Sequence, residues 1–203
     1  MILHQLELGP LRNFSYVIGD HLGGIGAVID PSAEFAKIAS VAAQDRLDLR
    51  FVINTHSHYD HTAGNGFFRE RGARLVASIL APTHPDLPVS DGETFAVGEL
   101  CVRVLATPGH CRDAICLIAD DTLFTGDTLF IGECGRTDLP GSDVRAMHHS
   151  LLTVLRGLPD HLEVMAGHNY GPAPSRTLGE EKRLNYTLQP RSLDELVAFM
   201  AVP

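Results

Sequence analysis

The sequence predicts an α/β (α+β) domain in which two β-sheets pack against each other and helices cover both outer faces. Two patterns lead to this prediction. Short apolar runs bounded by Gly, Pro and Asp recur through the first half of the chain and are typical of strands. Strands also precede helices in two successive blocks, which suits two packed sheets with helices outside them. The chain has 203 residues, 44% of them hydrophobic, and no repeat or linker, so we expect one domain over residues 1–203.

The first half of the chain predicts a series of short strands and two helices. The turn Asp30-Pro31-Ser32 leads into the first helix, for which Ser32 is the expected cap. The second helix is expected to stop at Gly72. The predicted strands are Leu3–Leu8, Ser15–Ile18, Ala27–Ile29, Arg50–Asn54 and Arg74–Ala77, and the second helix is Asn65–Arg71.

The second half continues with strands and then changes to helices. A hairpin is expected around Asp120-Asp121, because apolar strand-like runs lie on both sides of it. Apolar residues near helical spacing after Asp143 predict a long helix. The predicted strands are Glu93–Val97, Leu100–Ala106, Ile115–Ala119, Thr122–Phe124 and Glu163–Ala166, and the helices are Asp143–Gly157, Thr177–Tyr186 and Leu193–Met200.

Charge and composition exclude several classes of function. A formal net charge of -9 argues against binding nucleic acid through its phosphates. We see no long apolar segment for a membrane span, and no basic region followed by an apolar stretch at the start of the chain. The cysteines lack the paired spacing of a zinc knuckle or redox motif, which favours reduced thiols. We therefore expect a cytoplasmic protein that acts on a small molecule; these features predict no oligomeric state.

Metal-binding side chains cluster in one short run that contains His56, His58, Asp60 and His61. The run follows a predicted strand, and a tight strand-to-helix turn can point alternate side chains in different directions. His56 and His58 would then serve one metal ion, and Asp60 and His61 a second. Imidazole and carboxylate are ligand types that zinc and iron favour. The alternative is a polar loop that contains histidines by chance, which needs many coincidences at this spacing.

This run resembles the His-x-His-x-Asp-His signature of the metallo-β-lactamase superfamily. Further motifs of that family follow in order, as Thr107-Pro108-Gly109-His110, Thr125-Gly126-Asp127 and Gly167-His168. The resemblance implies an αββα sandwich of two mixed β-sheets with metal ions at one edge between them. It also implies a catalytic role for Asp60 and Asp127. The implied ligands are His56, His58 and His110 for the first metal, Asp60, His61 and His168 for the second, and Asp127 as the bridge.

The stretch from Gly126 to Gly141 resembles the glyoxalase II branch, which hydrolyses hydroxyacylglutathione thioesters. That branch implies two divalent metal ions, zinc or else iron or manganese, which lower the pKa of a shared water and give hydroxide near neutral pH. It also implies that Arg136 and Tyr170 contact the substrate, since a guanidinium can grip a carboxylate through two hydrogen bonds. We therefore expect first a metal-dependent hydrolase of a thioester of glutathione or another thiol.

A second enzyme class remains open. The segment Gly135-Arg136-Thr137-Asp138 and the tail after His168 also resemble the persulfide dioxygenases of the same superfamily. That resemblance implies glutathione persulfide as substrate and one ferrous ion on His56, His110 and Asp127. Glyoxalase II enzymes carry an aromatic residue at the position of Asp138. They also usually have a separate C-terminal helical domain, for which the about 35 residues after His168 are too few.

The loop after His110 departs from the pattern of the superfamily. In the superfamily, the residues after this His are often Thr-Pro-Gly or Ser-Pro-Gly. In this chain they are Cys111-Arg112-Asp113. Losing Pro and Gly changes the backbone angles that the loop can adopt. We expect Arg112 to add charge near the mouth of the site, and Cys111 to line the site without being a ligand. The remaining alternative is a non-catalytic binding module with a vestigial site, although such sites usually lose ligands.

Overall fold

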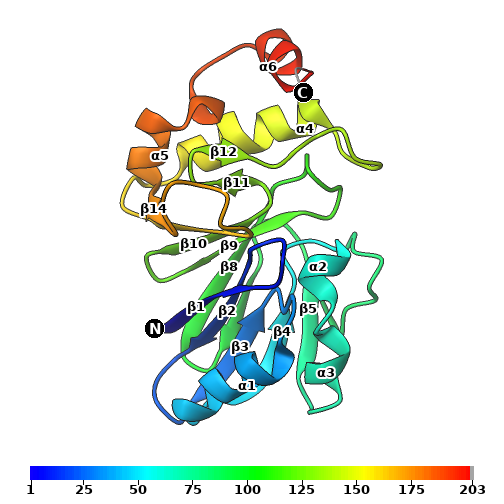
Figure 1. Ribbon diagram of the computed structural model, residues 1–203, viewed down its shortest axis with the longest axis vertical. Coiled ribbons are helices and arrows are strands. Elements are labelled where there is room, and N and C mark those ends of the chain that lie inside the picture. The colour runs from blue at the N-terminus through cyan, green and yellow to red at the C-terminus, as the bar shows by residue number, and fades with distance from the viewer. Residues whose placement is uncertain (202–203) are drawn as a thin grey trace.

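Two six-stranded β-sheets form the centre of the structure, a computed structural model that describes residues 1–201 (Figure 1). The first sheet consists of β1 (Ile2–Leu8), β2 (Asn13–Gly19), β3 (Ile25–Ile29), β4 (Asp48–Ile53), β5 (Arg74–Ser78) and β6 (Leu87–Val89), in that order. The second has the order β14 (Arg176–Thr177), β13 (Glu163–Ala166), β10 (Thr122–Gly126), β9 (Ile115–Ala119), β8 (Leu100–Ala106) and β7 (Thr94–Val97). A separate small pair joins β11 (Leu129–Phe130) and β12 (Glu133–Cys134).

Both sheets mix parallel and antiparallel pairs. In the first sheet β1, β2 and β3 pair antiparallel, and β3 to β6 pair parallel. In the second, β7 to β10 are antiparallel and β10 pairs parallel with β13. Ile18 lies opposite Ala27, and Val104 lies opposite Leu117. Residues directly opposite each other on neighbouring strands point to the same face of the sheet. These four side chains point inwards and belong to the hydrophobic cluster between the sheets.

Helices cover the outer face of each sheet. α1 (Phe35–Gln44) and α3 (Asn65–Arg69) pack on the first sheet, where Ile38 and Phe68 share a buried cluster with Val52 of β4. α4 (Val144–His149) and α5 (Leu178–Leu184) pack on the second, and α6 (Leu193–Met200) lies over α4 (Figure 1). The expected αββα sandwich is therefore confirmed. Within residues 1–201, every helix is too short or too polar to span a bilayer.

Two local predictions for helices differ from the structure. Ser32 does not cap α1, which starts three residues later; its backbone N–H and side chain instead contact Ser15 Oγ at 3.1 Å. The predicted helix Asp143–Gly157 is helical, but α4 continues as a π-helical turn over Ser150–Val154 and a 3₁₀ turn over Leu155–Gly157. Ser150 donates a hydrogen bond to the carbonyl of Pro108, which ties this helix to the loop that carries His110.

Four short strands were missed, two at the edges of the sheets and two in the separate small pair. β6 contains Pro88, which lowers the strand signal and is tolerated because β6 is an edge strand. β14, β11 and β12 have two residues each, too few for alternation to be recognised. The last predicted helices are present as α5 and α6, and a 3₁₀ turn at Tyr186–Leu188 lies between them. Thr177 and Ser192 each form a capping box at the start of these two helices.

Candidate metal centre

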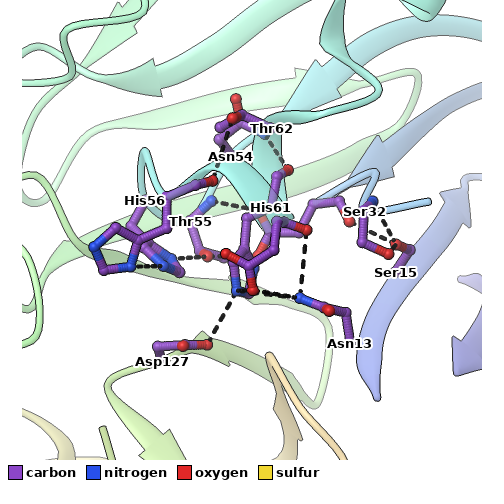
Figure 2. A network of polar contacts seen from close by, with 12 residues as sticks. Asn13, Ser15, Ser32, Asn54, Thr55, His56, His61, Thr62 and Asp127 are labelled. Atoms are coloured by element: carbon purple, nitrogen blue, oxygen red, sulfur yellow. Dashed lines mark hydrogen bonds and ion pairs between the residues drawn. The ribbon is translucent and has the colours of Figure 1, made fainter. Parts of the chain in front are cut away.

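The seven side chains that the motifs single out lie together at the ends of strands from both sheets. The segment after β4 carries four of them: His56 and His58 in the loop, and Asp60 and His61 in the short helix α2 (Tyr59–Thr62). His110 follows β8, Asp127 follows β10, and His168 lies two residues beyond β13. Figure 2 shows Asp127 pointing towards His61, whose Nε2 is 3.4 Å from Oδ1 of Asp127.

Two motif glycines make this convergence sterically feasible. Gly126 has a φ of 48°, a conformation that L side chains rarely adopt, and a Cβ at this position would collide with the side chain of Thr55. A Cβ on Gly167 would collide with Oδ1 of Asp127. The backbone after β13 therefore approaches the Asp127 carboxylate as closely as only glycine permits, and this places His168 beside it.

Three imidazoles form the first group of candidate donors. Nε2 of His56 lies 3.1 Å from Nδ1 of His58, which in turn lies 2.9 Å from Nε2 of His110. Oδ2 of Asp127 is 3.6 Å from Nε2 of His110. Three ring nitrogens and a carboxylate oxygen thus face one another, which is a donor set typical of zinc and iron sites.

A second group lies next to the first. Nε2 of His61 is 3.2 Å from Nε2 of His168. Oδ2 of Asp60 lies 3.5 Å from the His61 nitrogen and 3.4 Å from the His168 nitrogen. Oδ2 of Asp127 also lies 3.3 Å from Nε2 of His168. The Asp127 carboxylate therefore reaches both groups, which is the position that a bridging ligand requires.

Hydrogen bonds on the outer side of the rings fix which nitrogen faces the centre. Nδ1 of His110 donates to the carbonyl of Arg136 at 3.0 Å, and Nδ1 of His168 donates to the carbonyl of Leu11 at 2.9 Å. A carbonyl oxygen only accepts, so both rings carry a hydrogen on Nδ1. In the neutral tautomer that these bonds select, Nε2 is the nitrogen without a hydrogen and faces the centre, as a metal ligand must.

Asp30 orients two further histidines and was missed from the sequence. Its Oδ2 lies 3.1 Å from Nδ1 of His61 and accepts from Oγ1 of Thr55 at 2.5 Å. That hydroxyl contacts Nδ1 of His56 at 3.2 Å and accepts from it, because its own hydrogen goes to Asp30. Asp30 is 2% exposed. The available signal was an acidic residue directly after a buried strand, which we assigned to a turn.

Asn13, at the start of β2, is a second residue that the sequence did not point to. Its Nδ2 donates to Oδ2 of Asp60 at 2.9 Å and lies 3.3 Å from the Asp60 carbonyl. Asn13 is 3% exposed. It holds the Asp60 carboxylate beside the second donor group from a strand distant in the chain.

The carboxylates and imidazoles shift each other's ionisation. Burial would raise the pKa of Asp127, but the neighbouring His61, His168 and His56 hold it well below its usual range. Burial would likewise lower the pKa of His61, whereas Asp127 and Asp30 raise it to about 9. Burial and the nearby His61 hold the pKa of His56 well below its ordinary value. In the metal-free protein, a proton on His61 therefore partly offsets the negative charge of Asp127 and Asp30.

This donor set fits a divalent metal ion. The Nδ1 atoms of His61 and His168 form hydrogen bonds away from the centre, so their Nε2 lone pairs face each other at 3.2 Å. Two facing lone pairs repel each other unless a proton or a metal ion lies between them. Oδ1 of Asp127 is buried and has no hydrogen-bond partner. A buried carboxylate oxygen in that state is costly unless a cation compensates it.

A cavity of about 360 Å³ opens on the donors, and both predicted substrate-binding residues line it. The ring of Tyr170 stacks on His168, with centroids 4.6 Å apart and an interplanar angle of 11°. The guanidinium of Arg136 forms two hydrogen bonds of 2.6 Å with Asp138. Arg136 is thus at the predicted place, but its charge is already paired. Phe130 gives the cavity an apolar wall.

The unusual loop after His110 sends its side chains in different directions. Cys111 is buried, and its Sγ lies 3.3 Å from Nε2 and 3.7 Å from Nδ1 of His58. Arg112 is exposed, and Asp113 is buried. The thiol, not the cation, is therefore the part of this loop that contacts the candidate ligands.

Comparisons with known proteins show which family the chain belongs to. The family model of the metallo-beta-lactamase superfamily matches residues 8–74 and 70–168. The human mitochondrial persulfide dioxygenase ETHE1 is 32% identical, over 98% of this chain and 80% of that protein. The probable polyketide biosynthesis zinc-dependent hydrolase BaeB of Bacillus velezensis is 30% identical, over 92% of this chain and 86% of its own.

A hydroxyacylglutathione hydrolase is also among the relatives. The probable hydroxyacylglutathione hydrolase glo2 of Schizosaccharomyces pombe is 32% identical, over 80% of this chain and 66% of that protein. Among solved structures, ETHE1 from Myxococcus xanthus superimposes with a TM-score of 0.94 at 35% identity, over 100% of this chain and 92% of that one. The motifs, the sandwich and these matches agree, and the chain belongs to the metallo-β-lactamase superfamily.

Proposed function

We propose that this protein is a persulfide dioxygenase, which uses one ferrous ion and O₂ to oxidise the outer sulfur of a small persulfide such as glutathione persulfide. The observation that supports this most is the match of the entire chain to ETHE1 from Myxococcus xanthus. The human persulfide dioxygenase also aligns with nearly all of the chain, whereas the probable hydroxyacylglutathione hydrolase glo2 aligns with a smaller part. The order of the two enzyme classes expected from the sequence is therefore reversed.

His56, His110 and Asp127 would hold the iron, and Nδ1 of His58 lies beside them. The bound ion supplies the O₂ chemistry that amino-acid side chains lack. The chain itself presents unprotonated nitrogens on His56 and His110 and an ionised carboxylate on Asp127. The hydrogen bond from His110 to the Arg136 carbonyl keeps that ring in the required tautomer.

The cavity residues would bind and orient the substrate. Phe130 and Leu139 provide apolar surface for the sulfur chain, and Tyr170 provides a flat ring next to His168. Arg136 would bind a carboxylate of the thiol carrier. To do so, its guanidinium would either bind Asp138 and the substrate carboxylate together or break its hydrogen bonds to Asp138. This arrangement would place the charged end of the substrate at the mouth of the cavity and its sulfur towards the donors.

Thioester hydrolysis at a two-metal centre is the second candidate, and one observation favours it. The second donor group is fully assembled, because Asp60, His61 and His168 bring their donor atoms within 3.5 Å of one another. A single-iron enzyme leaves these three residues to be explained as a supporting polar network. The relative BaeB is described as a zinc-dependent hydrolase, which agrees with this candidate.

One experiment separates the two candidates. The protein is purified without oxygen, its metals are counted, and the same sample receives glutathione persulfide or, separately, a glutathione thioester. We expect one iron per chain, oxygen consumption with the persulfide and no thioester cleavage. Two metals per chain and thioester cleavage without oxygen consumption would reject the dioxygenase.

Asp60→Asn sharpens this test because it changes only the second donor group. A single iron on the first group should remain at one per chain, whereas a two-metal centre should lose one metal ion. Asp121→Asn is the control, since Asp121 is an exposed carboxylate that pairs with His161 away from the site. It should leave the metal content at the wild-type value.

A further inference from the structure

A buried carboxylate in the C-terminal part of the chain takes no part in the candidate metal centre. Glu181 of α5 is 0% exposed. A glutamate is almost never fully buried unless its carboxylate is paired. Its Oε1 accepts a hydrogen bond from the Arg176 guanidinium at 3.2 Å, which satisfies one side of the carboxylate. The contacts of the second oxygen therefore show what else this buried group holds in place.

That second oxygen, Oε2, holds the turn between β11 and β12. It accepts a hydrogen bond from the backbone N–H of Gly132 at 2.8 Å and another from Nδ2 of Asn185 at 2.9 Å. The same Nδ2 lies 3.2 Å from the carbonyl oxygen of Phe130 and 3.0 Å from that of Glu133. Asn185 is also 0% exposed. One carboxylate and one amide thus hold the turn and a residue of each strand.

This hairpin needs support from outside, because each of its strands has only two residues. An isolated hairpin of two strands is at best marginally stable in water. Besides α5, the hairpin contacts the backbone after Tyr170, where a Cβ on Gly171 would collide with the carbonyl oxygen of Ile131. Its position therefore depends on segments that lie far away in the chain.

The hairpin forms a wall that two cavities share. Phe130 lines the cavity that opens on the donors, and Glu133 and Cys134 line both this cavity and a neighbouring one of about 560 Å³. Arg136, two residues beyond the hairpin, also lines both cavities. The hydroxyl of Tyr186 donates a hydrogen bond to the Glu133 carboxylate and lines the second cavity. The position of the hairpin therefore determines the shape of the surface that faces the substrate.

We propose that Glu181 and Asn185 are positioning residues, which fix the hairpin so that Phe130 and Arg136 face the substrate in the geometry that binds it. They act on substrate binding and leave the metal ion unaffected, because their contacts are to the hairpin and not to the donors. The inference rests on the proposed function for the substrate, but it applies equally to a persulfide and a thioester, which would meet the same wall.

Glu181→Gln tests this role because it keeps the size of the side chain and replaces one acceptor oxygen with an NH₂ group. The substrate is glutathione persulfide or a glutathione thioester, whichever the wild type turns over. We expect its KM to rise by about fivefold, kcat to change by less than about twofold, and the metal content to stay at the wild-type value. A role in stability alone would lower Tm and leave KM unchanged.

Glu180→Gln is the matched control. Glu180 precedes Glu181 in α5, but its carboxylate forms the capping box with Thr177. This variant should weaken the start of the helix and keep the wild-type KM. An unchanged KM in Glu181→Gln, or an equal rise in both variants, would overturn the positioning role. Loss of metal from Glu181→Gln would also overturn it, since the network would then act on the donors.

Hydrogen exchange tests the same contacts without turnover. In the wild type, the amides of residues 130–134 should exchange as slowly as those of α5, because the Gly132 N–H donates to Glu181. In Glu181→Gln they should exchange about tenfold faster, while the amides of β9 keep their wild-type rate. Wild-type exchange as fast as that of exposed loops would overturn the inference even if the variant does not fold. If the wild type turns over neither substrate, the proposed function fails, and this measurement alone decides whether Glu181 holds the hairpin.

Discussion

Nδ1 of His61 lies 3.1 Å from Oδ2 of Asp30, and both side chains are shielded from solvent. Asp30 follows β3, whereas His61 lies in α2 after β4, so the contact joins two neighbouring parallel strands of the first sheet. An outer carboxylate of this kind fixes the tautomer of a metal-binding imidazole and makes its inner nitrogen more basic. Asp30 also holds Thr55, which contacts His56, so one carboxylate supports a histidine in each donor group.

Asp30→Asn should weaken metal binding by about 10- to 100-fold, because an amide lacks the negative charge that orients His56 through Thr55 and supports His61. Asn tolerates the φ of 48° that Asp30 adopts, so the backbone should be retained. Affinity is measured by competition with a coloured chelator. Asp45→Asn is the control, since it removes the carboxylate of an Asp–His pair with His4 away from the site. Equal affinity in both variants would show that Asp30 does not support the metal centre.

Metal affinity should rise with pH if an ion occupies the second donor group, as the two-metal candidate requires, and should lack this dependence for a single iron on His56, His110 and Asp127. In the metal-free protein the pKa of His61 is raised to about 9, so a metal ion that uses Nε2 of His61 must displace a proton at neutral pH. We expect the apparent affinity to increase by up to about tenfold per pH unit between pH 7 and about 9. Calorimetry in buffers of different ionisation enthalpy should detect the released proton. An affinity that stays flat over this range would mean that His61 is not a ligand.

The same raised pKa affects the stability of the metal-free protein. Because the folded-state pKa of His61 lies above its ordinary value, its protonated form stabilises the fold fully below about pH 6.5. That contribution is lost as the pH rises through about 9. Thermal unfolding of the metal-free protein at pH 7 and pH 9.5 should therefore give a lower Tm at the higher pH, and added zinc should reduce the difference.

Asp127→Asn should remove at least one metal ion and lower turnover by about 100-fold or more. The amide keeps the size of the side chain but removes the charge that faces His61, His110 and His168. Metal analysis and turnover on the same sample are the measurements. The control is Asp160→Asn, which removes an exposed carboxylate paired with Lys182. Unchanged metal content in Asp127→Asn would remove this residue from the ligand set.

Arg136→Ala should raise KM by about fivefold while changing kcat less, since a contact to the carrier that persists through the reaction affects binding alone. Steady-state kinetics with glutathione persulfide give both constants. Arg50→Ala is a matched control, because Arg50 also pairs with an acidic residue two positions away, Asp48, at the surface. An identical KM in wild type and Arg136→Ala would reject the substrate contact.

Much of the candidate site was predictable because its information is local. The histidines and aspartates sit in motifs a few residues long, and the glycines beside them leave no room for a side chain, as at Gly126 and Gly167. Strand and helix positions followed from apolar spacing for the same reason. The prediction of Ser32 as a cap was wrong because its partner Ser15 is distant in the chain, and no local pattern reveals that contact.

The sequence by itself determined the superfamily, the order of the longer strands and helices, and the candidate donors. The tertiary structure alone decided which partners those donors have: Asp30 behind His61, Cys111 against His58, and Asn13 on Asp60. The physical reason is that a motif specifies backbone shape and side-chain type over a few residues. Charge balance, tautomers and metal geometry depend on atoms that folding brings together from distant segments.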